Sequence, residues 1–146
     1  MTRQGEFLIM LVISTICAMR WGGRPERIGA ATLFIGAVLS AAVVSPIGER
    51  FHHVEIGILL ADMALLGIFI WLSLRSPRYW PISIGGILAA EVLIHLGSIA
   101  APHVHWLAYM NATVLWGWAA QTVIVIATLR HRYRLVDQGA DALWKS

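Results

Sequence analysis

Long apolar runs, separated by short segments that contain arginine, glycine and proline, dominate the chain. A helix needs about 17–25 mostly apolar residues to cross the ~30 Å hydrocarbon core of a bilayer. Four runs reach this length: residues 28–44, 54–74, 81–101 and 106–129. The pattern therefore predicts four full transmembrane helices.

The first apolar run, residues 7–19, is shorter than the other four. It crosses a membrane only if polar side chains at its ends, such as Arg20, reach out to the lipid headgroups. Two alternatives stay open: a helix that lies in the interface or re-enters the membrane, and a cleaved signal peptide, because Arg3 precedes the run. No small-residue cleavage motif follows the run. We therefore expect a short N-terminal membrane helix.

Glycine and proline mark the ends of the predicted helices. Gly22 and Gly23 can end the first helix, and Pro25 suits the first turn of the second. Pro46 can end the second predicted helix and Pro102 the fourth, because proline interrupts the backbone hydrogen bonds of a helix. The expected helices cover about residues 5–21, 26–45, 54–75, 80–101 and 105–130. Short connections make consecutive helices antiparallel, which predicts an all-α fold: an integral membrane helical bundle of four full transmembrane helices plus a short N-terminal membrane helix.

Composition excludes a soluble domain. The 146 residues are 58% apolar and 13% charged, whereas a soluble domain is ~45–50% apolar and ~25% charged. Eleven Lys and Arg outnumber eight Asp and Glu, for a net charge of +3. The basic residues lie between the apolar runs rather than along a polar surface, so they indicate membrane topology and no nucleic-acid partner. The single cysteine, Cys17, excludes an intrachain disulfide.

Arginines concentrate on one side of the predicted membrane. With five antiparallel helices, only Arg3 and Arg50 fall on the other side. The concentrated set is Arg20, Arg24, Arg27, Arg75, Arg78, Arg130, Arg132 and Arg134. Because cytoplasmic loops carry an excess of basic residues, the arginine-rich side is cytoplasmic. We expect a multi-pass protein of the bacterial inner (plasma) membrane, with one transmembrane domain over residues 1–134 and a short cytoplasmic tail at 135–146.

Histidines gather on the opposite, outer side of the predicted membrane, beside two glutamates. The residues are His52, His53, His103, His105, Glu49 and Glu55. Imidazole and carboxylate groups are ligands that transition metals take, so these residues are candidate ligands for a metal ion. Neutral imidazole also titrates near pH ~6.5, which suits a proton relay or a pH switch. A third interpretation is that histidine is tolerated at headgroup level, since the spacing matches no defined metal site.

Polar residues inside the predicted helices form a second candidate site, made of Asp62, Glu91, His95 and Asn111. Asp62 lies on the antiparallel neighbour of the helix that carries Glu91 and His95, so these side chains can meet at matched depth. A charged group at the bilayer centre costs at least ~2.5–3.5 kcal/mol, so such residues face inward and pair. Two interpretations remain: a functional polar site, or a hydrogen-bond network that determines which helices pack together.

Sequence motifs of the common enzyme classes do not occur in this chain: no metalloprotease helix motif, nucleophile elbow, phosphate-binding loop or dinucleotide fingerprint. We expect a non-enzymatic accessory or assembly subunit of a larger membrane complex, because 146 residues leave little chain outside the membrane. The alternative is a proton- or metal-handling membrane protein that uses the outer histidines above the buried polar site. The expected partners are the lipid bilayer and other membrane subunits or further copies of the chain.

Two connecting segments resemble those of a family of small polytopic bacterial inner-membrane proteins. They are Trp21-Gly-Gly-Arg-Pro-Glu-Arg27 and Leu74-Arg-Ser-Pro-Arg-Tyr-Trp-Pro81, followed by His95-Leu96 in the next helix. The resemblance would cover most of the chain and implies a membrane fold of four or five helices. It brings no activity and no site residues.

Overall fold

The computed structural model describes the backbone of residues 3–43, 56–100 and 106–139, and the side chains of 5–42, 56–100 and 115–139. The helices are α1 (Arg3–Trp21), α2 (Arg24–Val43), α3 (Ile56–Arg75), α4 (Trp80–Ala100) and α5 (Trp106–Gln138). Within these ranges there is no strand, so the all-α helical bundle is confirmed.

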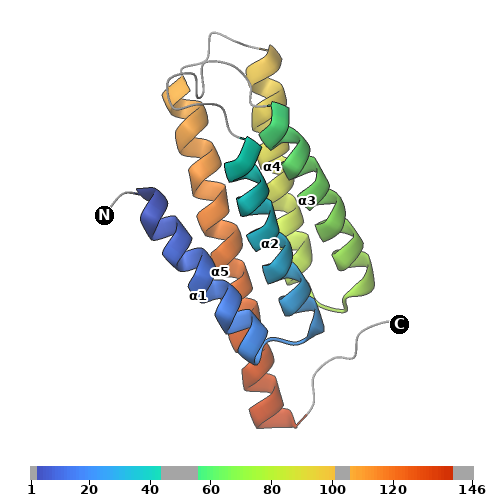
Figure 1. Cartoon of the computed structure of the whole chain (residues 1–146). Helices are drawn as coiled ribbons and strands as arrows, with labels where there is room; N and C mark the ends of the chain where they lie inside the picture. Colours follow the sequence, from blue (N-terminus) through green and yellow to red (C-terminus); the bar gives the residue numbers. More distant parts are fainter. Residues whose placement is uncertain (1–2, 44–55, 101–105, 140–146) are drawn as a thin grey trace.

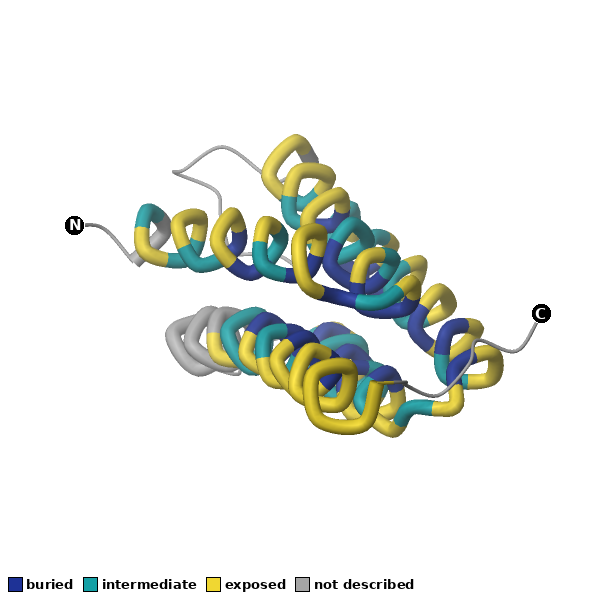
Figure 2. The backbone as a smooth tube through the Cα atoms, turned by 90° about the horizontal axis from the view of Figure 1, so that it is seen from below, coloured by how far each residue is buried: buried dark blue, intermediate teal, exposed yellow. Residues whose placement is uncertain are grey.

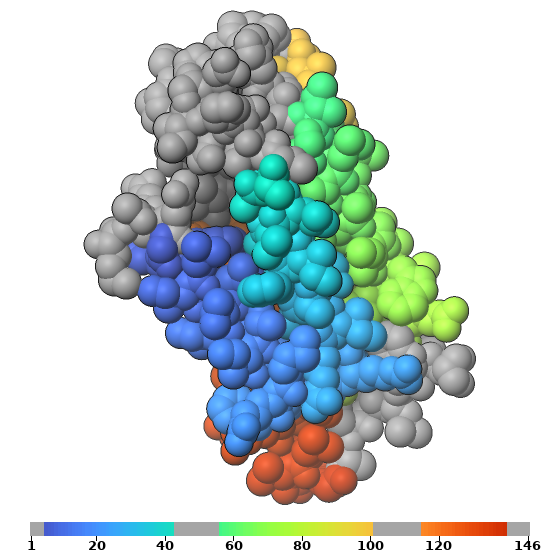
Figure 3. Space-filling model, viewed as in Figure 1, coloured from blue at the N-terminus to red at the C-terminus, as the bar shows by residue number. Residues whose placement is uncertain are grey.

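The five helices run alternately up and down along one bundle axis (Figure 1). The turns between α1 and α2 and between α3 and α4 lie at the same end, together with the final turns of α5. Figure 3 shows α1, α2 and α3 side by side on one face, with α2 between the other two. Helix α5 packs against α1, α2 and α4, so it closes the bundle from behind. The segments rich in arginine therefore come together in space.

Helix α5 is longer than the apolar pattern predicts. We expected a helix over about residues 105–130, but α5 continues to Gln138. It ends before Gly139, whose φ of 66° is a left-handed conformation that favours glycine. The predicted end of α5 was wrong because the length of an apolar run indicates how much of a helix can lie in lipid, and a helix can continue beyond that run. The polar residues after the run contain no helix breaker before Gly139.

The closest packing lies in the half of the bundle that contains the arginine-rich turns. Phe69, Leu72, Ile84 and Ile124 are at most 1% exposed and form the centre of this core. Gly29 permits the approach of α2 to α4, since a Cβ there would lie 2.6 Å from the Trp80 ring. Small residues let helix backbones approach closely in this way.

The outward faces of the helices are exposed (Figure 2), and many of the exposed side chains are apolar. Among the described residues, 29 large apolar side chains are exposed, against eleven buried apolar residues. Helices α3 and α4 are long and apolar enough to cross a membrane, and only 22% of each is buried. The described parts of α1, α2 and α5 do not meet this measure, so a bundle of four full spans is not confirmed.

Candidate functional site

A buried hydrogen bond joins α3 to α4 through Asp62 and His95. His95 Nε2 lies 3.1 Å from Asp62 Oδ2. The exposed fractions are 1% for His95 and 8% for Asp62. Asp62 comes about two turns after the start of α3, and His95 lies about as far before the end of α4. Since the helices are antiparallel, the two side chains lie at the same depth. The structure therefore brings together two of the residues that the sequence singled out.

The Asp62–His95 pair offers two protonatable groups within one hydrogen bond. A proton can reside on the imidazole or on the carboxyl group, and the bond persists in either case because one group donates and the other accepts. Charge-assisted bonds of this kind are stronger than neutral ones. Removing one partner would leave the other buried without a counterpart, which is costly in a low-dielectric interior.

Glu91 lies one helical turn before His95 and is partly buried. Its carboxyl group is close enough to Asp62 for the two to interact electrostatically. Ser98, which shares this face of α4, instead donates a hydrogen bond to the carbonyl of Ile94 at 2.9 Å. The site therefore holds two carboxyl groups and one imidazole. The side chain of Asn111 lies outside the described residues.

The outer histidine site falls on connecting segments that lie outside the described residues. This holds for His52, His53, His103, His105, Glu49 and Glu55. Their convergence and any metal binding by them stay predictions. In the part of the chain that the structure describes, no group of three or more His, Cys, Asp and Glu side chains could hold a metal ion.

A second buried polar cluster, which the sequence did not predict, lies at the arginine-rich end. Glu26 is 0% exposed and forms an ion pair with Nη1 of Arg78. Glu26 Oε1 accepts a hydrogen bond of 2.8 Å from Trp80 Nε1. Arg78 Nη2 lies 3.1 Å from Nδ1 of His131 on α5. The cluster, named here the Glu26 cluster, thus connects α2, α5 and the turn between α3 and α4.

Local backbone features position the Glu26 cluster. Glu26 lies in the first turn of α2, and its Oε2 accepts a hydrogen bond of 3.1 Å from the backbone N–H of Gly23. A glutamate that reaches back to cap the start of its own helix is a known N-terminal arrangement. A Cβ at Gly23 would lie 3.0 Å from the His131 ring, so glycine makes room for the histidine. Ser76 accepts a 3.2 Å hydrogen bond from the N–H of Arg78 and shapes that turn.

The sequence argument missed this cluster because it gave Glu26 no role in any site and treated Arg78 only as a mark of membrane topology. Both residues belong to the two connecting segments that carry the family resemblance. A single glutamate between Arg24 and Arg27, next to an arginine-rich turn, was the available signal. The partners are 52 residues apart, however, and only the packing of the bundle brings them together.

Comparisons with protein-family models, with curated proteins and with solved structures found no match to the chain. The resemblance to small polytopic inner-membrane proteins therefore stays a prediction.

Proposed function

We propose that the chain is a multi-pass protein of the bacterial inner membrane with its C-terminus in the cytoplasm. Support comes from α3 and α4, which are long and apolar yet only 22% buried. A helix in the core of a soluble protein is mostly buried, whereas these two expose their apolar side chains. The arginines of the two turns and of the end of α5 gather at one end of the bundle, in agreement with the positive-inside rule.

Reporter fusions test this topology. A fusion after Ser146 is expected to report from the cytoplasm, and a fusion after Glu49 from the opposite side. Two signals from the same side, or the reverse pattern, would overturn the orientation. Recovery of the chain in the soluble fraction of lysed cells would overturn the membrane placement itself.

For the function, we infer a proton-handling membrane protein, and the observation that carries this is the buried contact between Asp62 and His95. Within α3 and α4, the only basic side chain other than His95 is Arg75, in the last turn of α3. Within these two helices, the carboxyl groups of Glu91 and Asp62 therefore have one basic group nearby, the imidazole of His95. A buried carboxyl group and a partly buried one close to it cannot both be ionised cheaply, so the surplus carboxyl group is where a proton is held and released.

A flux assay tests proton handling. The purified chain is reconstituted in liposomes that contain a pH-sensitive dye, and a potassium diffusion potential drives protons inward. We expect faster acidification than in protein-free liposomes, and a loss of most of this flux in Asp62→Asn. The matched control is Glu6→Gln, an exposed carboxyl group in the first turn of α1, which keeps the flux. Equal flux in Asp62→Asn and the control would overturn the proposal.

An accessory or assembly subunit is the second candidate function, and the end of α5 favours it. This helix projects beyond the rest of the bundle (Figure 1). Tyr133 and Val136 on the projecting part are 74% and 80% exposed. Exposed apolar side chains beside arginines suit contact with another protein at the membrane surface. Purification in mild detergent is expected to recover partners in fixed ratio with the chain, and their loss after Tyr133→Ala/Val136→Ser. A chain that purifies alone would overturn this second function.

A further inference from the structure

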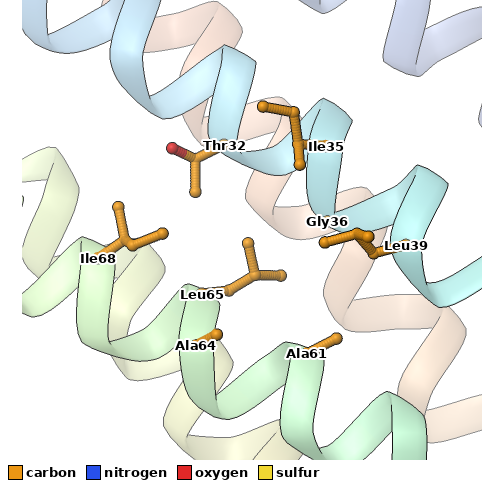
Figure 4. Close-up of a pocket in the computed structure, with 8 residues that line it drawn as sticks. All are labelled: Thr32, Ile35, Gly36, Leu39, Ala61, Ala64, Leu65 and Ile68. Atoms are coloured by element: carbon orange, nitrogen blue, oxygen red, sulfur yellow. The ribbon is translucent and has the colours of Figure 1, made fainter.

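A lengthwise groove lies between α2 and α3, away from the polar sites. Its volume is about 130 Å³, and its walls are almost wholly apolar (Figure 4). The lining residues are Thr32, Ile35, Gly36, Leu39, Ala61, Ala64, Leu65 and Ile68. Its floor is closed where Gly36 meets Leu65, since a Cβ at Gly36 would lie 2.6 Å from that leucine. The groove thus runs parallel to the helices and is narrow at the contact between Gly36 and Leu65.

Two arginines lie about two turns beyond the groove, on the same faces of α2 and α3, at the arginine-rich end of the bundle. Arg75 follows Ile68 by seven residues, which is two turns along the same face of α3. Arg24 precedes Ile35 by eleven residues, which is three turns along the same face of α2. Both arginines are exposed. A molecule lying in the groove therefore meets two cationic side chains two turns further along the same helix pair.

The distance from the groove to the two arginines matches the thickness of one leaflet of a bilayer. From the contact between Gly36 and Leu65, Arg75 lies ten residues and Arg24 twelve residues further along, which is about 15–18 Å at 1.5 Å per residue. Half of a ~30 Å hydrocarbon core has the same thickness. The Arg75 guanidinium also lies 5.8 Å from the ring of Trp71, an aromatic residue of the kind that marks the headgroup level.

We propose that the groove between α2 and α3 binds an anionic phospholipid, with one acyl chain along the groove and the phosphate between Arg24 and Arg75. Charge complementarity favours this occupant: a hydrophobic helix of a partner or of a second copy would fill the groove without using the two arginines. Basic pockets between membrane helices on the cytoplasmic side bind anionic headgroups in this manner. The proposal rests on the membrane placement proposed above, and it is independent of proton handling.

Native mass spectrometry of the detergent-purified chain with added phosphatidylglycerol tests the site. We expect one molecule of phosphatidylglycerol bound per chain. The occupancy by phosphatidylcholine, added at the same concentration, is expected to be at least fivefold lower. Arg24→Gln/Arg75→Gln is expected to lower phosphatidylglycerol occupancy at least fivefold, whereas Arg24→Lys/Arg75→Lys retains most of it. The matched control is Arg20→Gln/Arg130→Gln, which removes the same charge from the same end on α1 and α5. Equal losses in the two glutamine doubles would overturn the site.

A variant that fills the groove distinguishes lipid bound in the groove from lipid that is only attracted to the charged surface of the protein. Ala64→Leu places a larger side chain among the lining residues, and we expect it to remove the bound lipid. Gly86→Leu is the control on α4, because a Cβ there has no neighbour within 4 Å. Lipid that persists in Ala64→Leu, or a dimer of the chain without lipid, would overturn the proposal.

The two proposals fail in different ways. If the chain does not insert into phosphatidylglycerol nanodiscs, the membrane placement is wrong. If it inserts but retains phosphatidylglycerol and phosphatidylcholine equally, only the lipid site is wrong. Asp62→Asn is expected to keep full lipid occupancy, so loss of proton flux and loss of lipid are separate results.

Discussion

The Glu26 cluster and the Asp62–His95 pair are both buried, yet they are built differently. Glu26 is held by Arg78, Trp80 and the backbone of Gly23, and Arg78 also meets His131. Asp62 and His95 join α3 to α4 through one hydrogen bond of 3.1 Å, with a further carboxyl group nearby. Among the described residues, the first set gives one carboxylate several partners, whereas the second brings two carboxyl groups to one imidazole.

This difference distinguishes a contact that stabilises the fold from a contact that can transfer a proton. In the Glu26 cluster, charge is compensated and the partners come from three parts of the chain: the start of α2, the turn before α4, and α5. The contact therefore determines how the turns pack. In the Asp62 pair, a proton can move while the helices stay in place, because the hydrogen bond survives a change of donor. We therefore expect mutations in the first to affect folding and mutations in the second to affect proton transfer.

The largest effect is expected for Glu26→Gln. This change removes the charge opposite Arg78 and leaves a buried cation without its partner, which costs about 3–5 kcal/mol in comparable pairs. Unfolding in detergent micelles, followed by circular dichroism, measures the loss. Glu6→Gln is the control, since Glu6 is exposed. A stability of Glu26→Gln equal to that of the control would show that the cluster does not hold the fold.

A steric change beside the same cluster is expected to have a smaller effect. In Gly29→Ala, the new methyl group meets the Trp80 ring at 2.6 Å and the Cδ1 atom of Ile124 at 3.0 Å. The hydrogen bond from Trp80 to Glu26 restrains the ring, so overpacking should cost about 1–3 kcal/mol. Gly86→Ala, which has open space, should be neutral or more stable by about 0.5–1 kcal/mol. Melting temperatures that rise in both variants would contradict this account.

A double-mutant cycle on the other site measures the coupling of Asp62 to His95. Asp62→Asn and His95→Ala should each lower stability, and the double variant should lose less than the sum, with a coupling of about 0.5–3 kcal/mol. The comparison pair is Asp62→Asn with Glu26→Gln, which should be additive within about 0.3–0.5 kcal/mol because the sites lie in different halves of the bundle. Strict additivity for Asp62 and His95 would mean that they do not interact.

The smallest effect is expected at Gln121, which represents a third kind of buried polar residue. Gln121 is 2% exposed, and its amide nitrogen and oxygen have no hydrogen-bond partner among the described residues. Gln121→Leu should raise stability by about 1 kcal/mol, since an unsatisfied buried group carries a desolvation cost. Thr128→Val is the control, because Thr128 already donates to the Ile124 carbonyl, and it should bring no gain. A destabilised Gln121→Leu would contradict the prediction.

The apolar pattern predicted five helices and placed most of their ends within a few residues. Gly22, Gly23 and Pro25 marked the turn between α1 and α2 correctly, because glycine and proline act through their own backbone conformation. Pro46 and Pro102 lie outside the described residues. The pattern failed at the end of α5, where the helix continues through polar residues to Gln138. Four full spans are not confirmed, because this measure covers only the described residues, and among those only α3 and α4 are long and apolar enough.

Among the candidate site residues, Asp62 and His95 could be predicted to meet because a short turn makes α3 and α4 antiparallel neighbours. Helical geometry then determines which residues share a depth and a face. The Glu26 cluster could not be predicted in this way. Glu26, Arg78 and His131 come from helices and turns that are distant in sequence, and only the packing of α2 and α5 against the turn at Arg78 brings them together.

The sequence by itself determined the helices, their order and the gathering of arginine at one end, because each depends on neighbouring residues and on the length of apolar runs. The tertiary structure decided which charges are neutralised, which glycines are close contacts and where α2 and α3 leave a groove. Those outcomes depend on the distances between helices. Such distances arise from the fit of many side chains at once, and no local pattern in the chain encodes them.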